Sequence, residues 1–160
     1  MKNNLFFKNI KKYFFTSSTP QKQPAKKNKK PAKTDYSKNI YEIFSGIITD
    51  LSYLELDFSN LSIKWGRNTK KRLKSVSLGS YSHSKKLIRI HPVLDGKFVP
   101  EFFIRSIIYH EIGHFIYFSY YPDSSTYHNK RFYSILKAID LDFYKSKRWL
   151  EENKTRLFQE

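Results

Sequence analysis

The segment from Glu101 to about Phe118 constrains the fold of this chain more than any other stretch of its 160 residues. The segment is largely apolar, and its length and pattern predict a long helix that is buried on most of its surface. Pro100 stands just before it, where the fixed φ of proline suits the first turn of a helix. Pro122 and Asp123 mark a break soon after it. We therefore expect the other elements of a small domain to pack around this helix.

The same helix carries the pattern H-E-x-x-H as His110-Glu111-Ile112-Gly113-His114. Histidines four residues apart lie one turn apart on the same face of a helix, so both imidazoles can reach one metal ion. Zinc lowers the pKa of a bound water toward roughly 7, and Glu111 stands where it can accept the proton as a general base. The pattern therefore predicts a zinc-dependent hydrolase with Glu111 as the catalytic residue. The alternative is an ordinary core helix with two hydrogen-bonded histidines.

A catalytic zinc ion needs a third protein ligand and one open coordination position. The metzincin pattern requires Gly three residues and His six residues after the second histidine. It fails here because Tyr117 and Tyr120 occupy those positions. His128 is the next histidine and lies at the start of the next predicted helix, whereas Asp123 is the rival candidate. We favour His128 because a neutral imidazole is the commonest metal ligand in proteins.

The rest of the sequence predicts short strands between helices. Apolar residues recur with helical period from Tyr36 to Leu56. Strand-like runs follow at 61–65, 76–81 and 87–91, and further helices are expected at about 129–139 and 143–157. This order indicates an α+β domain of the zincin type, with a short antiparallel or mixed sheet packed on the metal-binding helix and flanking helices. We expect the strand at 87–91 to offer its edge to an extended peptide.

We predict two regions, a basic tail over residues 1–35 and a folded domain over residues 36–160. The tail holds ten of the 30 Lys and Arg residues and one acidic residue. Residues 21–33 lack the apolar side chains needed to order a chain and are typical of a flexible linker. Within residues 5–14, apolar and basic side chains separate onto two faces at helical spacing. Two interpretations stay open: an amphipathic helix that docks on a membrane surface or a partner, and an extension that packs on its own domain.

The net charge of +16 at pH 7 makes anionic partners the default expectation, namely nucleic acid, an acidic membrane surface or an acidic protein. The sequence contains no cysteine, which excludes disulfides, a thiolate zinc site and a nucleophilic cysteine. This composition suits the reducing cytoplasm, where we expect the protein to act. No stretch has the apolar length of a transmembrane helix, and the N-terminus does not have the features of a signal peptide.

Several stretches in the same order resemble the SprT-like zinc metallopeptidases, the domain type that includes Spartan. The resemblance covers about Leu61 to Leu157. Its matching stretches are 65–67, 78–81, 88–92, 94–95, 99–101, 109–114, 128–132 and 147–153. The resemblance implies a minimal gluzincin-like fold, with zinc on His110, His114 and His128 and with Glu111 catalytic.

Some members of this family cut proteins attached to DNA, and several carry a cysteine-based zinc ribbon after the catalytic domain. This chain has no cysteine to build a ribbon. DNA or RNA binding would therefore use the basic tail and the six basic residues of the Lys64–Lys74 cluster. We predict a zinc metallopeptidase that hydrolyses peptide bonds in protein substrates, with proteins associated with nucleic acid as one candidate class. The alternative is a basic nucleic-acid-binding protein whose zinc site is mainly structural.

Four other residues invite a functional role, but each has a simpler interpretation. His91 ends a predicted strand and is expected to cap or lie at the surface rather than bind metal. His83 stands in a polar turn and is expected to be solvated. Tyr127 could donate to a developing oxyanion, and Trp65 could stack on a nucleobase, yet we expect both to pack within the domain.

Overall fold

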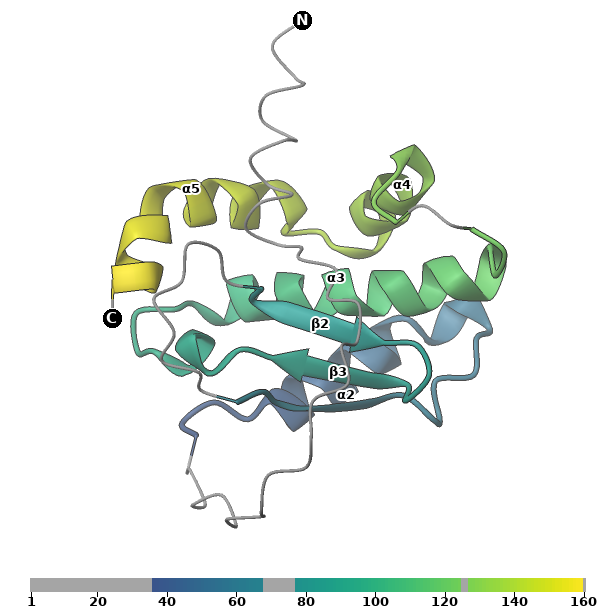
Figure 1. Ribbon diagram of the computed structural model, residues 1–160, viewed down its shortest axis with the longest axis horizontal. Coiled ribbons are helices and arrows are strands. Elements are labelled where there is room, and N and C mark those ends of the chain that lie inside the picture. The colour runs from purple at the N-terminus through teal and green to yellow at the C-terminus, as the bar shows by residue number, and fades with distance from the viewer. Residues whose placement is uncertain (1–35, 68–76, 125–126, 160) are drawn as a thin grey trace, which may run out of the picture.

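The computed structural model describes residues 36–67, 77–124 and 127–159. The described residues form four α-helices and a three-stranded mixed sheet, which confirms the predicted α+β class (Figure 1). The helices are α2 (Ile40–Asp50), α3 (Glu101–Tyr120), α4 (Lys130–Ile139) and α5 (Phe143–Gln159). The strands are β1 (Ser62–Trp65), β2 (Gly79–Ser82) and β3 (Leu87–Ile90), and two short 3-10 helices span Ser52–Leu54 and Pro92–Asp95. The predicted tail at 1–35, including 5–14, and residues 68–74 of the Lys64–Lys74 cluster lie outside the described residues.

The strand β3 lies in the middle of the sheet, since the strand order is β1-β3-β2. It pairs in parallel with β1 and antiparallel with β2. The prediction that the strand at 87–91 offers its edge to a peptide is therefore wrong, because both of its sides are already paired. Alternation along a strand indicates which side chains face the core, but it carries no information on which strands are its neighbours. Among the described strands, β1 and β2 form the two edges.

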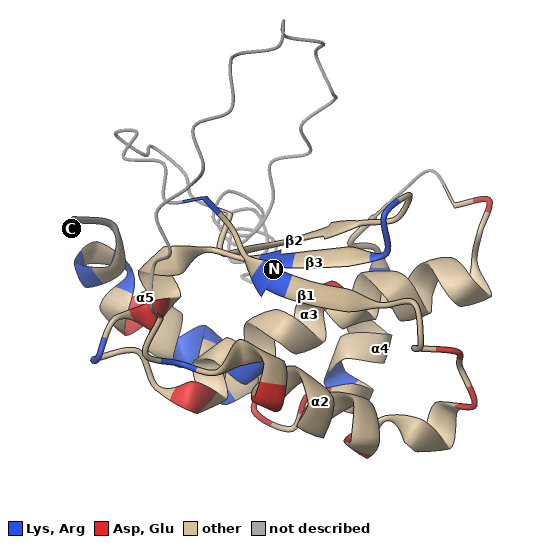
Figure 2. Ribbon diagram, turned by 90° about the horizontal axis from the view of Figure 1, so that it is seen from below, with Lys and Arg blue, Asp and Glu red and all other residues tan. Residues whose placement is uncertain are grey.

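The sheet buries one face and exposes the other. Ile63, Ile88 and Ile90 are buried, whereas Lys64 is exposed and Arg89 is partly exposed. This alternation is expected for a sheet covered on one side, because successive side chains point to opposite faces. The helices α2 and α3 lie on the same side of the sheet (Figure 2).

The helix α3 is the centre of the domain, as its apolar composition predicts. Figure 1 shows it between the sheet on one side and the helices α4 and α5 on the other. Its residues are buried almost without interruption from Phe103 to Tyr117. In the described part of the chain, no helix is both long and apolar enough to cross a lipid bilayer.

A buried polar cluster ties α3 to the beginning of α5. The hydroxyl of Ser106 donates to Oδ2 of Asp140 at 2.6 Å, and the hydroxyl of Ser146 donates to Ser106 at 2.6 Å. The other carboxylate oxygen of Asp140 accepts a hydrogen bond from the backbone N–H of Asp142. Burial raises the pKa of Asp140, although the hydrogen bond from Ser106 opposes this rise. The cluster is thus satisfied internally, as buried polar groups require.

Candidate metal centre

Three histidines meet between α3 and the beginning of α4. His110 and His114 lie one turn apart on α3 and are buried, whereas His128 comes from the segment that precedes α4. Their candidate ligand nitrogens all lie within 4.8 Å of one another, and the Nε2 atoms of His114 and His128 are 3.0 Å apart. A tetrahedral zinc ion holds its nitrogen ligands about 3.3 Å apart, given Zn–N bonds of about 2.0–2.1 Å. Small side-chain rotations would therefore suffice to hold one ion.

The rival third ligand, Asp123, does not join this group. Its side chain is exposed in the turn after α3. Among the described residues, the group that could hold a metal ion at this place consists of the three histidines.

A network around Asn129 places His128. The Asn129 side chain caps α4 by accepting a hydrogen bond from the Phe132 N–H at 3.1 Å, and its amide group donates to the Tyr117 hydroxyl of α3 at 2.6 Å. The Tyr117 hydroxyl also bonds to that of Ser124 at 2.7 Å, so both ends of the connection are held. His128 itself has a φ of 60°, in the left-handed region. Such a backbone is uncommon outside glycine and is retained where the surrounding structure demands it.

The ring of Phe132 packs against all three imidazoles. It is fully buried, and its ring centroid lies 5.1, 4.6 and 4.8 Å from those of His110, His114 and His128. The H-E-x-x-H pattern does not indicate this role, although Phe132 ends the stretch 128–132 of the family resemblance. The ring restricts the orientation of each ligand and excludes water from one side of the site.

The imidazoles of His110 and His114 are held in the neutral form that binds metal. Burial lowers the pKa of His110 well below its usual value, and the nearby His114 and His128 add to the effect. Burial, with a smaller contribution from His128, also lowers the pKa of His114 to about 3. A neutral imidazole offers a lone pair, so the donor set fits a divalent cation such as zinc.

Glu111 follows His110 on α3, about 100° round the helix from it, and its carboxylate meets the strand β2. The carboxylate is buried and accepts a hydrogen bond from the backbone N–H of Tyr81. Burial raises the pKa of Glu111 to about 8, and the Tyr81 hydrogen bond opposes the rise. A cation held by the neighbouring histidines would favour the ionised form and lower this pKa again.

Gly79 makes room for that carboxylate. A Cβ atom built at Gly79 would lie 2.6 Å from Oε1 of Glu111 and 3.0 Å from Cγ2 of Ile107. On the other side of α3, a Cβ atom built at Gly113 would lie 2.6 Å from Cδ2 of Leu136. Gly113 thus lets α4 pack closely on α3, and Gly79 does the same for β2.

The remaining candidates have the simpler roles. His91 accepts a hydrogen bond from the Val93 N–H at 3.1 Å and caps the short 3-10 helix, which confirms the capping interpretation. His83 is exposed, with its ring 4.8 Å from that of Phe118. Tyr127 is half exposed and packs on Phe118, and Trp65 stacks on Tyr36 with ring centroids 4.6 Å apart.

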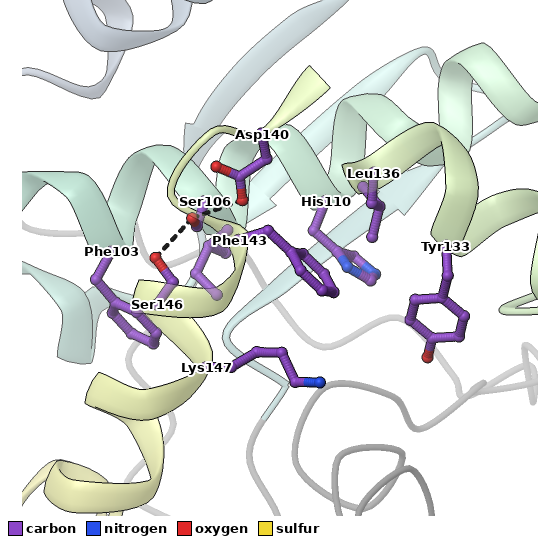
Figure 3. Close-up of a pocket in the computed structure, with 10 residues that line it drawn as sticks. Phe103, Ser106, His110, Tyr133, Leu136, Asp140, Phe143, Ser146 and Lys147 are labelled. Carbon is purple, nitrogen blue, oxygen red and sulfur yellow. Dashed lines mark hydrogen bonds between the residues drawn. The ribbon is translucent and has the colours of Figure 1, made fainter. Parts of the chain in front are cut away.

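Tyr133 is a residue of the site that the sequence analysis missed. It lies on α4 and lines a cavity together with His110 (Figure 3). Burial raises the pKa of its hydroxyl, which therefore stays protonated and able to donate. Its proximity to the histidines depends on the left-handed backbone at His128, which no local sequence pattern predicts.

The fold and the three-histidine group define an α+β protein with a candidate metal centre built on an H-E-x-x-H helix. A family model described as the SprT-like family matches residues 4–148. The chain therefore belongs to the SprT-like family. No curated protein showed significant similarity to it.

The two candidate third ligands can be separated by zinc binding. We expect His128→Ala to weaken zinc affinity by more than about 100-fold, since changes outside the ligand shell already cost about 10–100-fold. Asp123→Ala should leave the affinity unchanged, because its carboxylate lies outside the group. Competition with a chromogenic chelator measures both. Equal losses in the two variants would contradict the assignment of His128.

The contact between Gly79 and Glu111 predicts opposite effects for two glycine replacements. Gly79→Ala should lower the free energy of unfolding by about 1–3 kcal/mol, because the new methyl group must displace Glu111 or Ile107. Gly46→Ala, in the exposed interior of α2, should raise it by about 0.5–1 kcal/mol, since the nearest atom to its built Cβ is 3.9 Å away. Urea unfolding of the two variants tests this pair. A stabilising Gly79→Ala would show that the close approach is not required.

Proposed function

We propose that the protein is a zinc metallopeptidase that hydrolyses peptide bonds in protein substrates. The observation that carries this proposal is that the histidines and the glutamate of the H-E-x-x-H motif have different surroundings. Its two histidines join His128 in one metal-binding group, whereas Glu111 stays outside that group and is held against β2. A carboxylate next to a metal site but not bound to it suits a general base.

The chain's own residues supply the proton transfers. A zinc ion in this site would lower the pKa of a water molecule and polarise a substrate carbonyl. Glu111 would accept the proton from the attacking water, hold it on its carboxylate, and donate it to the leaving amine nitrogen. The phenol of Tyr133, beside His110, is the better placed donor for the negative charge that develops on the carbonyl oxygen. It takes the role considered for the half-exposed Tyr127.

The edge strand β2 is the element that suits an extended peptide. The N–H of Tyr81 reaches Glu111, so it points away from β3 and toward the free side of β2. A peptide added to this edge would therefore run beside the Glu111 carboxylate. Figure 1 shows that this edge of the sheet lies on the side of α4 and α5. Backbone pairing would align many different sequences, which suits a protein substrate.

A second candidate function, nucleic-acid binding, is favoured by the exposed face of the sheet. Lys64 and Arg89 lie directly opposite each other in the register of β1 and β3. Like charges in opposite positions are unfavourable unless an anion balances them. Phosphate groups would do so, which also suits the net charge of +16. This function can coexist with peptidase activity or replace it.

The role of Glu111 predicts that activity and metal binding separate. Glu111→Gln should keep zinc but lose cleavage by at least about 10²–10⁴-fold, the range expected for a general base. Glu101→Gln, an exposed change in the first turn of the same helix, is the matched control and should retain full activity. Cleavage of an unstructured protein, followed with zinc content, measures the effect. A wild-type rate in Glu111→Gln would refute the mechanism.

The Lys64–Arg89 pair predicts a change in salt dependence. The double variant Lys64→Glu/Arg89→Glu should make the slope of log K against log salt shallower by about 2 for double-stranded DNA, at about 0.9 per phosphate contact. Lys145→Glu/Arg148→Glu on α5 changes the net charge equally and should leave the slope unchanged. Fluorescence anisotropy over a salt series is the measurement. Equal slopes in the two double variants would remove the sheet face from the binding surface.

A further inference from the structure

A cavity opens between α3, α4 and α5, next to the candidate metal centre (Figure 3). His110 belongs both to the three-histidine group and to the wall of this cavity. The cavity therefore begins where the metal would be held, on the face of α3 that carries Ile107 and His110. It is not needed to bind the ion or to move the proton.

The cavity has apolar walls, and the polar groups behind them already have hydrogen-bond partners. Ile107, Leu136 and Phe143 bring apolar side chains from three different helices. Behind them lies the polar cluster of Ser106, Asp140 and Ser146, whose hydrogen bonds are made within the cluster. Polar groups that are bonded to one another do not require a polar ligand. The interior therefore suits an apolar group.

The size of the cavity limits what it can hold. Its volume is about 40 Å³. This is enough for one apolar side chain, whose length Leu136 and Phe143 would limit.

The side chain of Lys147 lies at the opening of the cavity. Figure 3 shows the ammonium of Lys147 and the hydroxyl of Tyr133 both directed toward the space below His110. The Lys147 ammonium lies 5.3 Å from the centre of the Phe143 ring, and the residue is partly buried. Burial lowers the pKa of Lys147, with Lys137 adding to this effect and Glu151 opposing it. A second cation brought to this opening would meet a positive charge in a partly desolvated place, where repulsion is stronger than in water.

We propose that this cavity binds the side chain of a residue adjoining the scissile bond, and that it selects apolar side chains such as Val or Leu while rejecting Lys and Arg. The inference rests on the proposed peptidase function, because it places the scissile carbonyl at the metal. Within that function, Leu136 and Phe143 set the size of the accepted side chain, and Lys147 sets its charge.

The first test uses the zinc-loaded full-length protein and peptides built around a mapped cleavage site. The peptides differ only at one of the two residues that flank the bond, which is Ala, Leu, Phe, Lys or Glu. At one of these positions we expect Leu to exceed Lys by at least tenfold in kcat/KM, within the about 10–200-fold range of side-chain pockets. Lys147→Glu should reduce this ratio about tenfold. Phe143→Ala should shift the preference from Leu toward Phe.

The matched control is Lys145→Glu, which makes the same charge change two residues away. Lys145 lies over the ring of Phe102 and pairs with Asp142, outside the cavity. Its Leu to Lys ratio should equal that of the wild type. Zinc content and thermal unfolding of each variant show that it is folded.

A second test measures binding without turnover. Two mercaptoacetyl amino acid amides, carrying Leu or Lys next to the metal-directed thiol, are titrated into the zinc-loaded protein by calorimetry. We expect tighter binding of the Leu compound, and a smaller difference in Lys147→Glu. If binding discriminates in this way but no peptide is cleaved, the cavity is supported and the peptidase proposal is wrong. If peptides are cleaved with ratios that do not respond to Lys147 or Phe143, the cavity proposal is overturned and the peptidase proposal stands.

Discussion

The structure depends on the close approach of α4 to α3 at Gly113. Because this position has no side chain, Leu136 and Phe132 of α4 can pack directly on the central helix. That contact brings the beginning of α4 to the histidines of α3, so His128 can meet His110 and His114. A Cβ atom at this place would push α4 outward, and the third imidazole would move with it. The same contact forms one side of the cavity beside His110. Metal binding and the shape of the neighbouring cavity are thus consequences of one packing constraint.

The two sides of α3 carry different parts of the proposed chemistry. The side toward β2 holds Glu111 in the space left by Gly79, and the side toward α4 holds the ligands. Both sides bury ionisable groups, which shifts the pKa of Glu111 upward and those of His110 and His114 downward. Such shifts mean that the charged forms are unfavourable in the folded protein before a cation is present. A cation would stabilise the carboxylate and occupy the imidazole lone pairs, so metal binding and folding should support each other.

The parts of the site that could be predicted from the sequence are those whose geometry is local. The spacing of His110 and His114 fixes their common face once a helix is assumed, and the apolar run from Glu101 sets that helix. His128 could be favoured by its residue type and its place after the break at Pro122. The order of the strands could not be predicted, because β1 pairs with β3 although β2 lies between them in the sequence. The edge available to a peptide was therefore assigned to the wrong strand. The position of Tyr133 beside the histidines depends on the left-handed backbone at His128. Contacts between α3 and α4 hold that backbone in place.

The cavity also bears on how a small peptidase could choose among protein substrates. Val and Leu side chains are mostly buried in folded proteins, so a site that requires one beside the scissile bond finds few accessible places on a folded surface. Pairing with β2 would add the requirement of an extended backbone, which a folded substrate offers only at flexible or unfolded segments. The two requirements together would direct cleavage to locally unfolded chains without recognition of a particular sequence. Rejection of Lys and Arg at the same position would narrow this choice further on basic substrates. A basic sheet face formed by Lys64 and Arg89 would then bring the proposed peptidase to proteins held on nucleic acid, while the cavity would restrict which of their bonds are cut.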